Sequence, residues 1–360
     1  MAPKLEDVRA LNDLVTTTLA LLAQFHTYLT PTVDLPPTAP IENPPNPLHI
    51  LRDAARLVKA HTTKISLLAI NKPFTPSAIR KVLNELTATC LPAMMSAVHI
   101  CEQEKTTWGV FMGSEVQARV RRVFKEMEML LEEVRAIAAG NAGASRRDSL
   151  SSTGVVWESC DALIELEKLD IAGLAVQKAE QYRDTIKDAI EELREWMEGD
   201  DTDTEGFDAL LDENDEAVEG DTDSIDDIFN AANSMPKDRP ELQKLVEEAE
   251  GKLKKVVLLY SALIKRRLKT YKRSVEHENG EKANVVEKLD ETMQCLRRIP
   301  HQVDELASCF YDLDEERAKA MLAKCTDEAK RAALVMEKSW ETAADDEFTA
   351  WSRKWKEAVG

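Results

Sequence analysis

The chain has 360 residues and a formal net charge of −19, with 66 acidic against 47 basic side chains. Much of the excess lies in residues 198–236, which hold 15 carboxylates and no Lys or Arg. Twelve glycines and 5% aromatic residues are few for a β-sandwich or a doubly wound α/β fold. The composition indicates a nearly balanced helical body with an acidic insert, and it argues against non-specific wrapping of nucleic acid, which needs clustered basic residues.

The N-terminal part of the chain has the apolar period of a helix. Apolar residues recur at steps of three and four over 4–29. An extended connector over 30–48 follows, because seven of the 14 prolines lie there and proline lacks the N–H that helices and central strands need. The same periodicity predicts three further helices, over 48–70, from Thr75 to Cys101 with a kink at Pro92, and over 113–139.

Small and polar residues dominate 140–152, which predicts a mobile loop. Within it, Ser149 follows Arg-Arg-Asp, a pattern that basophilic kinases read, so Ser149 is a candidate phosphorylation site. Helical periodicity returns over 156–164 and 171–197. We therefore predict a first helical bundle over 1–197, which includes the proline-rich connector.

The acidic stretch 198–236 has too few apolar residues to offset the entropy of ordering, so we predict a disordered linker. Ser224, followed by acidic residues, suits an acidophilic kinase and is a second candidate phosphorylation site. Residues 201–206 resemble the first half of a calcium loop, but Asp212 stands where a bidentate Glu is expected. The match therefore indicates weak condensation of cations, and we predict no metal site.

The C-terminal part begins with a long predicted helix from Pro240 to Glu276. Its centre, 256–264, is apolar on all sides, which is typical of a helix surrounded by others. We predict a second bundle over 237–360, and hence an all-α fold of two antiparallel helical bundles joined by an acidic disordered linker. Its remaining predicted helices cover 281–298 and 301–311, separated by Pro300, and then 314–340 and 342–357.

Six basic residues fall within nine positions near the end of this long helix. They are a candidate nuclear-import signal or anion-binding patch. The alternative is a solvated helix face that attracts the acidic linker. The six residues are Lys265, Arg266, Arg267, Lys269, Lys272 and Arg273.

Nothing in the sequence matches a catalytic or cofactor motif. Phosphate-loop, dinucleotide and nucleophile-elbow glycine patterns are missing, and no His follows a Glu by three positions, as di-iron bundles require. The six cysteines form no Cys-x-x-Cys pair and are predicted to be reduced and mostly buried. Without a signal-peptide pattern or a membrane-spanning run, we expect a non-enzymatic protein of the cytoplasm and nucleus that uses no cofactor.

Three segments and the acidic stretch carry a resemblance to a known family. Val-Trp-Glu-Ser-Cys at 156–160, Lys-Asp-Ala-Ile-Glu at 187–191, the acid after it and Leu-Tyr-Ser-Ala-Leu-Ile-Lys at 259–265 together resemble the cyclin-D-binding (GCIP-like) family, in a fungal-type version. The resemblance implies helical bundles of the vinculin/talin-rod type. It further implies a regulator that binds cell-cycle and transcription proteins through bundle faces, without direct contact to nucleic acid. The signature residues Trp157, Cys160 and Asp188 are interpreted as packing residues.

A second class of function stays open at this stage, namely a cytoskeletal or membrane-associated adaptor of the vinculin kind. For the interaction regulator, exposed aromatic side chains are the expected anchors for partners, and Trp340, Trp351 and Trp355 are the candidates. Because Trp351 and Trp355 are four residues apart on one predicted helix face, they are equally suited to closing the bundle.

Overall fold

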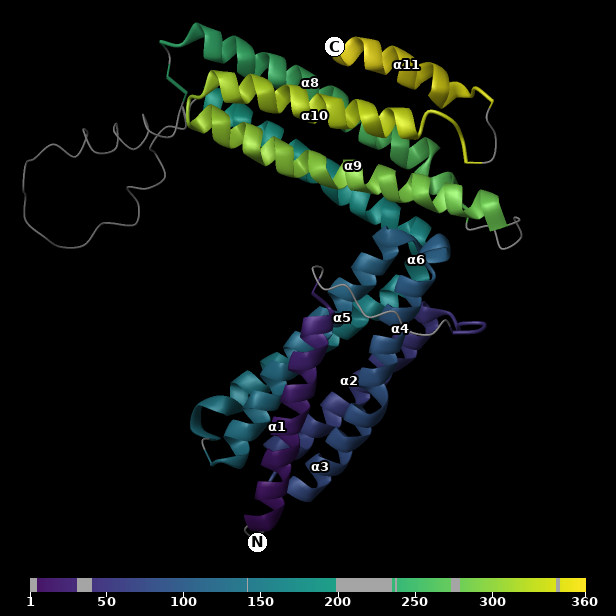
Figure 1. The fold of residues 1–360 in the computed structure, drawn as a ribbon. Coiled ribbons are helices and arrows are strands. Elements are labelled where there is room, and N and C mark those ends of the chain that lie inside the picture. Colours follow the sequence, from purple (N-terminus) through teal and green to yellow (C-terminus); the bar gives the residue numbers. More distant parts are fainter. Residues whose placement is uncertain are drawn as a thin grey trace, which may run out of the picture. The chain divides into compact units, whose positions relative to one another are not determined.

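The computed structural model describes residues 5–30, 41–140, 142–198, 235–236, 238–272, 279–340 and 344–360; side chains of 142–150 and 279–284 are not among those described. Every regular element in these residues is a helix, which confirms the all-α prediction (Figure 1). The acidic residues 199–234, with Ser224 and the calcium-like segment, lie outside the described residues. So do Arg273 and the side chain of Ser149, and both phosphorylation sites stay predictions.

The chain divides into two compact units. Met1–Leu174 and Ser274–Asp290 form the first, and Ala175–Arg273 and Glu291–Gly360 form the second. The sequence predicted a first bundle over 1–197. The structure instead places the helical residues after Leu174 in the second unit. Helical periodicity identifies an inward face but does not say which neighbours cover it, and this explains the difference.

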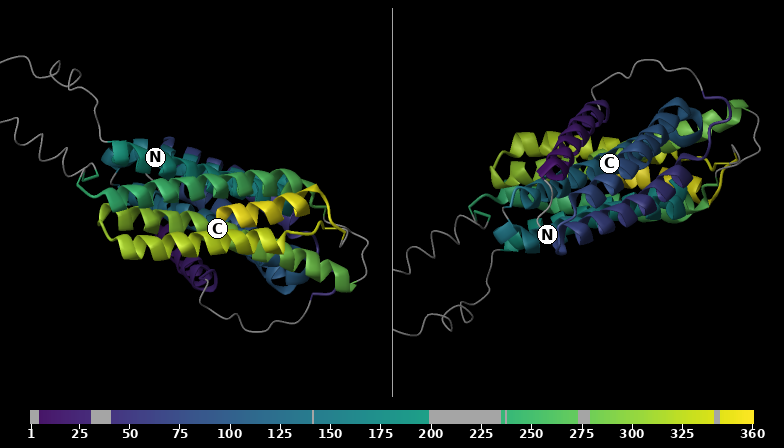
Figure 2. Two further views of the ribbon diagram at one scale, coloured as in Figure 1. Left: turned by 90° about the horizontal axis from the view of Figure 1, so that it is seen from above. Right: turned by 90° about the horizontal axis from the view of Figure 1, so that it is seen from below.

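Among the described residues, the first unit contains α1 to α5, the first part of α6 and the first part of α9 (Asn279–Tyr311). α1 packs against α3 and α5, and α2 packs against α3 and α4 (Figures 1 and 2). α2 begins where the Asn46 side chain accepts a hydrogen bond from the Leu48 amide at 2.9 Å, directly before a proline in the first turn. The elements are α1 (Leu5–Tyr28), α2 (Pro47–Ile70), α3 (Pro76–Glu85), α4 (Leu91–Gln103), α5 (Lys105–Ala138) and α6 (Ala142–Glu198).

Several helix boundaries differ from those predicted. α6 begins at Ala142, so the segment predicted as a loop over 140–152 is largely helical, and its only break is at Asp170, where φ is 51°. α9 (Asn279–Tyr311) continues through Pro300, where two helices were expected. Ile299, directly before this proline, and Val303, in the next turn, are both buried, and the packing of this segment offsets the lost hydrogen bond.

The second unit consists of the last part of α6, then α8 (Pro240–Arg266), most of α9, α10 (Glu315–Val335) and α11 (Glu347–Val359) (Figures 1 and 2). α8 ends ten residues before the predicted boundary and passes into a short 3₁₀ turn, Leu268–Thr270. Tyr260 lies fully buried at the centre of this unit, and its hydroxyl donates to the Leu296 carbonyl at 2.6 Å. α8 and α10 pack against each other, and α11 contacts both.

All six cysteines are free and buried, as the sequence predicted. Burial raises the pKa of the Cys101, Cys160 and Cys325 thiols to about 12. Thiols held in this way are protonated at neutral pH and poor nucleophiles, so these residues act as small apolar groups of the core.

A glycine and a carboxylate together start the main part of α5. Gly109 has a φ of 71°, which breaks the helix, and a new helical run begins at Val110. The Asp290 carboxylate accepts hydrogen bonds from the amides of Val110 at 2.7 Å and Phe111 at 2.9 Å. A negative charge here complements the positive end of the helix dipole. Burial raises the pKa of Asp290, although both amide bonds act in the opposite direction.

We predict that Gly109→Ala destabilises the first unit by about 2 kcal/mol. A Cβ at this position would lie 2.6 Å from Asp290 Oδ1, and the positive φ strains any L-side chain. Gly113→Ala is the matched control, because its Cβ would meet Cys101 at an ordinary 3.9 Å. In a regular helix that change should stabilise by about 0.5–1 kcal/mol. Urea denaturation measures both, and equal stability of the Gly109 variant and wild type would contradict the prediction.

Candidate functional site

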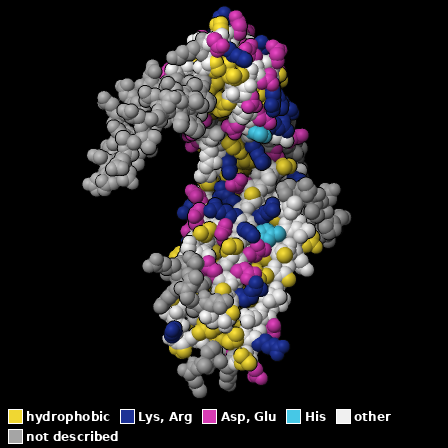
Figure 3. Space-filling model, turned by 90° about the vertical axis from the view of Figure 1, so that its left-hand side faces the viewer, with side chains coloured by type: hydrophobic (Ala, Val, Ile, Leu, Met, Phe, Trp, Pro, Cys, Tyr) yellow, Lys and Arg dark blue, Asp and Glu magenta, His cyan; other side chains and the backbone are white. Residues whose placement is uncertain are grey.

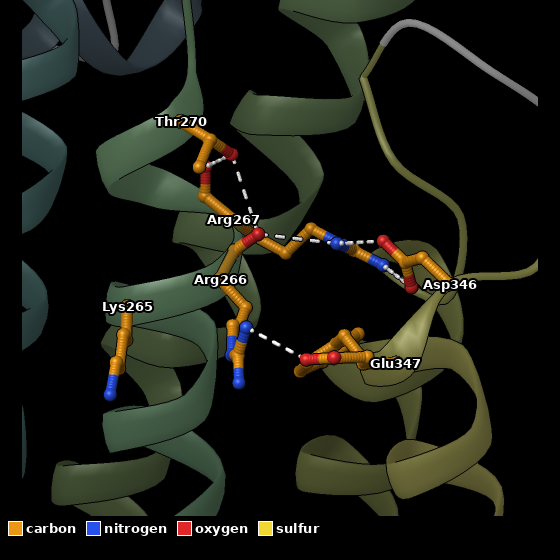
Figure 4. A pocket seen from close by; sticks show the side chains of 7 residues that line it. Lys265, Arg266, Arg267, Thr270, Asp346 and Glu347 are labelled. Atoms are coloured by element: carbon orange, nitrogen blue, oxygen red, sulfur yellow. Dashed lines mark hydrogen bonds and ion pairs between the residues drawn. The ribbon is translucent and has the colours of Figure 1, made fainter.

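Arg267 is a buried arginine at the end of α8, only 2% exposed. Its guanidinium forms a two-point ion pair with Asp346, at 2.7 and 2.9 Å (Figure 4). The other N–H groups donate to the carbonyls of Met336 at 2.8 Å, Glu337 at 3.0 Å and Arg266 at 3.1 Å. All five donors of the side chain are therefore used, which is what a buried arginine requires.

Aromatic rings enclose the same arginine. The guanidinium carbon lies 4.4 Å from the centre of the Phe348 ring, a cation–π contact. The Trp340 indole donates to the Arg267 backbone carbonyl at 2.7 Å, and its ring meets Tyr271 edge to face. The end of α8, the residues after α10 and the start of α11 are thus joined through one residue.

Asp346 has a second role as the N-cap of α11. Its carboxylate accepts from the Thr349 amide at 2.8 Å, and the Thr349 hydroxyl lies 3.2 Å from the Asp346 amide, which completes a capping box. Hydrogen bonding to Arg267 is the main cause that holds the pKa of Asp346 well below its usual range. The carboxylate is therefore ionised at neutral pH and fixes both the arginine and the helix start.

These contacts correct the interpretation of the six basic residues as one patch. Arg267 is buried, Arg266 pairs with Glu347 at 3.0 Å, and Lys269 pairs with Glu180 at 3.5 Å. Lys265 and Lys272 are exposed, and no described residue pairs with either. The basic residues therefore do not form one accessible import signal or anion-binding patch. The arginine at its centre, Arg267, is buried and stabilises the packing of the unit.

An apolar groove lies beside this cluster, between α8 and α11. It has a volume of about 490 Å³ and adjoins a second hollow of about 450 Å³ over the Arg267–Asp346 pair (Figure 4). The first hollow is lined on the α8 side by Leu258, Ser261, Ala262, Lys265 and Arg266, and on the α11 side by Glu347, Phe348 and Trp351.

Leu258 is the feature of this groove that the sequence did not predict. The central segment of α8 was expected to be surrounded by other helices, and Leu259, Tyr260 and Leu263 are indeed buried. Leu258 instead is 59% exposed. Leu258 lines the groove together with Ala262, Phe348 and Trp351, and a contiguous apolar surface of this kind is a candidate interaction site. The mostly apolar run concealed it, because Ser261 is the single polar residue within 256–264 and did not by itself mark the solvent side.

The tryptophans proposed as anchors are mainly structural. Trp355 is buried and its indole donates to the Lys255 carbonyl at 2.8 Å, and Trp340 supports Arg267 as described above. Trp351 is half-buried and lies between the rings of Phe348 and Trp355, at 5.6 and 6.3 Å. Of the three, Trp351 alone lines the groove, and the expectation that Trp355 closes the bundle fits its position.

The family-signature residues are dispersed. Cys160 is buried, as a packing residue should be, but Trp157 is 37% exposed and Asp188 lies in solvent. The interpretation as packing residues is therefore wrong for Asp188. It holds only in part for Trp157, because more than a third of that residue is exposed. Both lie on α6, but Trp157 belongs to the first unit and Asp188 to the second.

A hollow of about 540 Å³ in the first unit, between α1 and α5, has a different character. His26, Arg121, Arg122, Lys125 and two glutamates line it. Arg122 pairs with Glu158 at 2.9 Å and Lys125 with Glu128 at 3.4 Å, so most of the positive charge is already neutralised. Figure 3 likewise shows acidic and basic side chains intermingled over one face, with apolar side chains in small groups.

Within the described ranges, no cluster of His, Cys, Asp and Glu is suited to hold a metal ion. The same part of the chain contains no helix that is both long and apolar enough to cross a membrane. The described residues thus define an all-helical protein with an apolar groove on its second unit.

Comparison with known proteins identifies the family. Residues 50–199 match the N-terminal domain, and residues 199–333 the C-terminal domain, of the Grap2 and cyclin-D-interacting family. The chain belongs to this family, which confirms the resemblance seen in the sequence, and the relationship supports a role in protein interaction.

Two relatives are similar over most of their length. One is an uncharacterized protein of Schizosaccharomyces pombe, 26% identical over 324 residues, which are 88% of this chain and 87% of the relative. The other is the cyclin-D1-binding protein 1 homolog of Xenopus laevis, 26% identical over 272 residues, which are 74% of this chain and 72% of the relative. The similarity thus extends across both units.

We predict that Asp346→Asn lowers the free energy of unfolding by about 2 kcal/mol. A fully buried pair would be worth more, but the Asp346 side chain is 39% exposed and solvent screens it. Asn still caps a helix, so the loss reports the ion pair, and Asp346→Ala should cost about 1 kcal/mol more. Asp345→Asn, next to it on the surface, is the control and should change stability far less.

The same variant has a defined pH dependence. Because the folded pKa of Asp346 is depressed, its stabilisation is complete above the unfolded value of 3.8 and is lost as the pH falls below it. The difference in stability between wild type and Asp346→Asn should therefore be constant near neutral pH and shrink below about pH 4. A difference that persists unchanged to pH 2 in urea denaturation would rule out the ion pair as its source.

Proposed function

We propose that this protein is a non-enzymatic regulator of cell-cycle or transcription proteins, which it binds through faces of its helical bundles in the nucleus and cytoplasm. D-type cyclins are the first partners to consider. The observation that carries the proposal is the family relationship, which spans residues 50–333 and therefore both units. A relative of similar length is named for binding cyclin D1.

The groove between α8 and α11 supports the proposal physically. Its apolar side chains stand on helices fixed by the Arg267–Asp346 pair, so a partner meets a surface that needs little ordering. Energetically important residues of interfaces cluster around such anchors, and tryptophan is prominent among them. Trp351, held between two rings, has the properties of such an anchor.

The test is direct binding of the purified full-length chain to a purified D-type cyclin by calorimetry. We expect a 1:1 complex with a dissociation constant in the micromolar range or tighter. A version that lacks 198–236, measured beside the full chain, determines whether the acidic stretch takes part. A control cyclin of another class reports specificity. Absence of heat at cyclin concentrations near 100 µM would contradict the proposal for D-type cyclins.

A cytoskeletal adaptor of the vinculin kind predicts a different result. In that case the protein would sediment with filamentous actin or with actin-linked proteins and would ignore the cyclin. Co-sedimentation with actin, combined with no cyclin binding, would replace the regulator proposal by the adaptor.

A further inference from the structure

One stripe of α8 is left uncovered by the other described helices of its unit. Leu258, Ala262 and Lys265 follow each other at steps of four and three residues, so they lie on one face of the helix. This face lines the hollow, whereas Leu259 and Leu263, on the opposite face of α8, are buried. The stripe spans eight residues, about 10 Å or two helical turns.

α11 supplies a rigid opposite wall. Phe348 is buried under the Arg267 guanidinium, and Trp351 lies against its ring at 5.6 Å. Trp355 supports Trp351 from the next turn and is itself held by a hydrogen bond to α8. The indole of Trp351 is therefore positioned before a partner arrives, and binding immobilises few groups.

Some of the charged side chains around this groove form ion pairs with described residues and others do not. Lys265 lines the groove on α8, and Lys354 follows Trp351 by three positions on α11, which places it on the same face of that helix. Both are exposed, and no described residue pairs with either. The Arg266–Glu347 pair at 3.0 Å is itself exposed, so it contributes little and can be exchanged for a pair with a partner. An incoming carboxylate would find available cations at the edge of the apolar groove.

We propose that the groove between α8 and α11 binds an amphipathic helix of a partner protein, with leucine-like side chains between Leu258 and Trp351 and acidic side chains beside Lys265 and Lys354. The proposal rests on the interaction role given above and specifies the chemistry of the partner. Anchors of a bound helix at i, i+3 or i+4, and i+7 span the same two turns as the stripe on α8.

Other occupants fit these observations less well. A stable dimer needs about 800 Å² from each partner, and a stripe of two helical turns falls short of that area. An anionic lipid surface is broad and flat, whereas the apolar side chains here line a hollow between two helices. A single helix is the occupant whose length and charge suit the groove.

The test uses two synthetic helices of 18 residues with identical leucine positions, one with Glu and one with Lys at the flanking positions, both labelled with fluorescein. Fluorescence anisotropy measures their binding to the full-length protein. We expect the acidic helix to bind with a dissociation constant of about 10 µM, and at least tenfold more tightly than the basic helix. Its affinity should fall as salt rises, because exposed charges are screened.

Variants locate the site. Leu258→Asp and Trp351→Ala should each weaken binding of the acidic helix about tenfold or more, and Lys265→Glu should reduce its advantage over the basic helix. Leu334→Asp is the matched control, because Leu334 is an equally exposed leucine, at 61%, on α10 of the same unit. Circular dichroism confirms that each variant is folded, and Trp351→Phe should retain most of the binding.

Three results would overturn the proposal. They are equal affinity for the two helices, equal loss from Leu258→Asp and Leu334→Asp, and a dimer in sedimentation equilibrium that Leu258→Asp dissociates. The cyclin measurement keeps this test separate from that of the proposed function. Cyclin binding that survives Leu258→Asp, with no binding of the acidic helix, rejects the groove while the regulator stands. Binding of the helix at the groove without cyclin binding supports the groove and rejects the cyclin.

Discussion

The geometry of the second unit depends on the requirement that a buried guanidinium must have every N–H paired. Arg267 meets it by drawing together two carbonyls after α10, one on α8 and the carboxylate that caps α11. Removing the Asp346 carboxylate would leave guanidinium donors without their charged partner, at the cost of about 2 kcal/mol predicted for Asp346→Asn. The position of α11 against α8, and with it the groove, follows from this one side chain.

The same constraint explains why the most basic segment of the chain does not form a uniform basic surface. Arg267 is used internally, and the pairs of Arg266 and Lys269 occupy two more charges. What remains accessible is a few cations beside an apolar hollow, a mixture typical of the rim and centre of a protein interface. The acidic excess of the chain lies elsewhere, outside the described residues, and the helices themselves carry nearly balanced charge.

Patterns in the local sequence predicted those features that depend on interactions between neighbouring residues. The helical period located most helices within a few residues, and the interruption predicted between Cys101 and residue 113 contains the break at Gly109. The patterns were wrong where distant packing decides, as in the helix that continues through Pro300 and the division of α6 between units. Arg267 could not be distinguished from its basic neighbours, because Asp346 lies 79 residues away. The exposure of Leu258 could not be predicted for a similar reason. Which faces of α8 are covered by other helices is determined by the fold and not by the local sequence.

A shallow groove of this kind suits reversible regulation better than permanent assembly. Its apolar floor is short, so the favourable area is limited, and exposed cations contribute more to the rate and selectivity of encounter than to affinity. The preorganised Trp351 compensates in part, because little entropy is lost on binding. The expected outcome is a complex of moderate affinity whose selectivity comes from the sign of the partner's charge and whose lifetime is short enough to be controlled by the concentration of the partner.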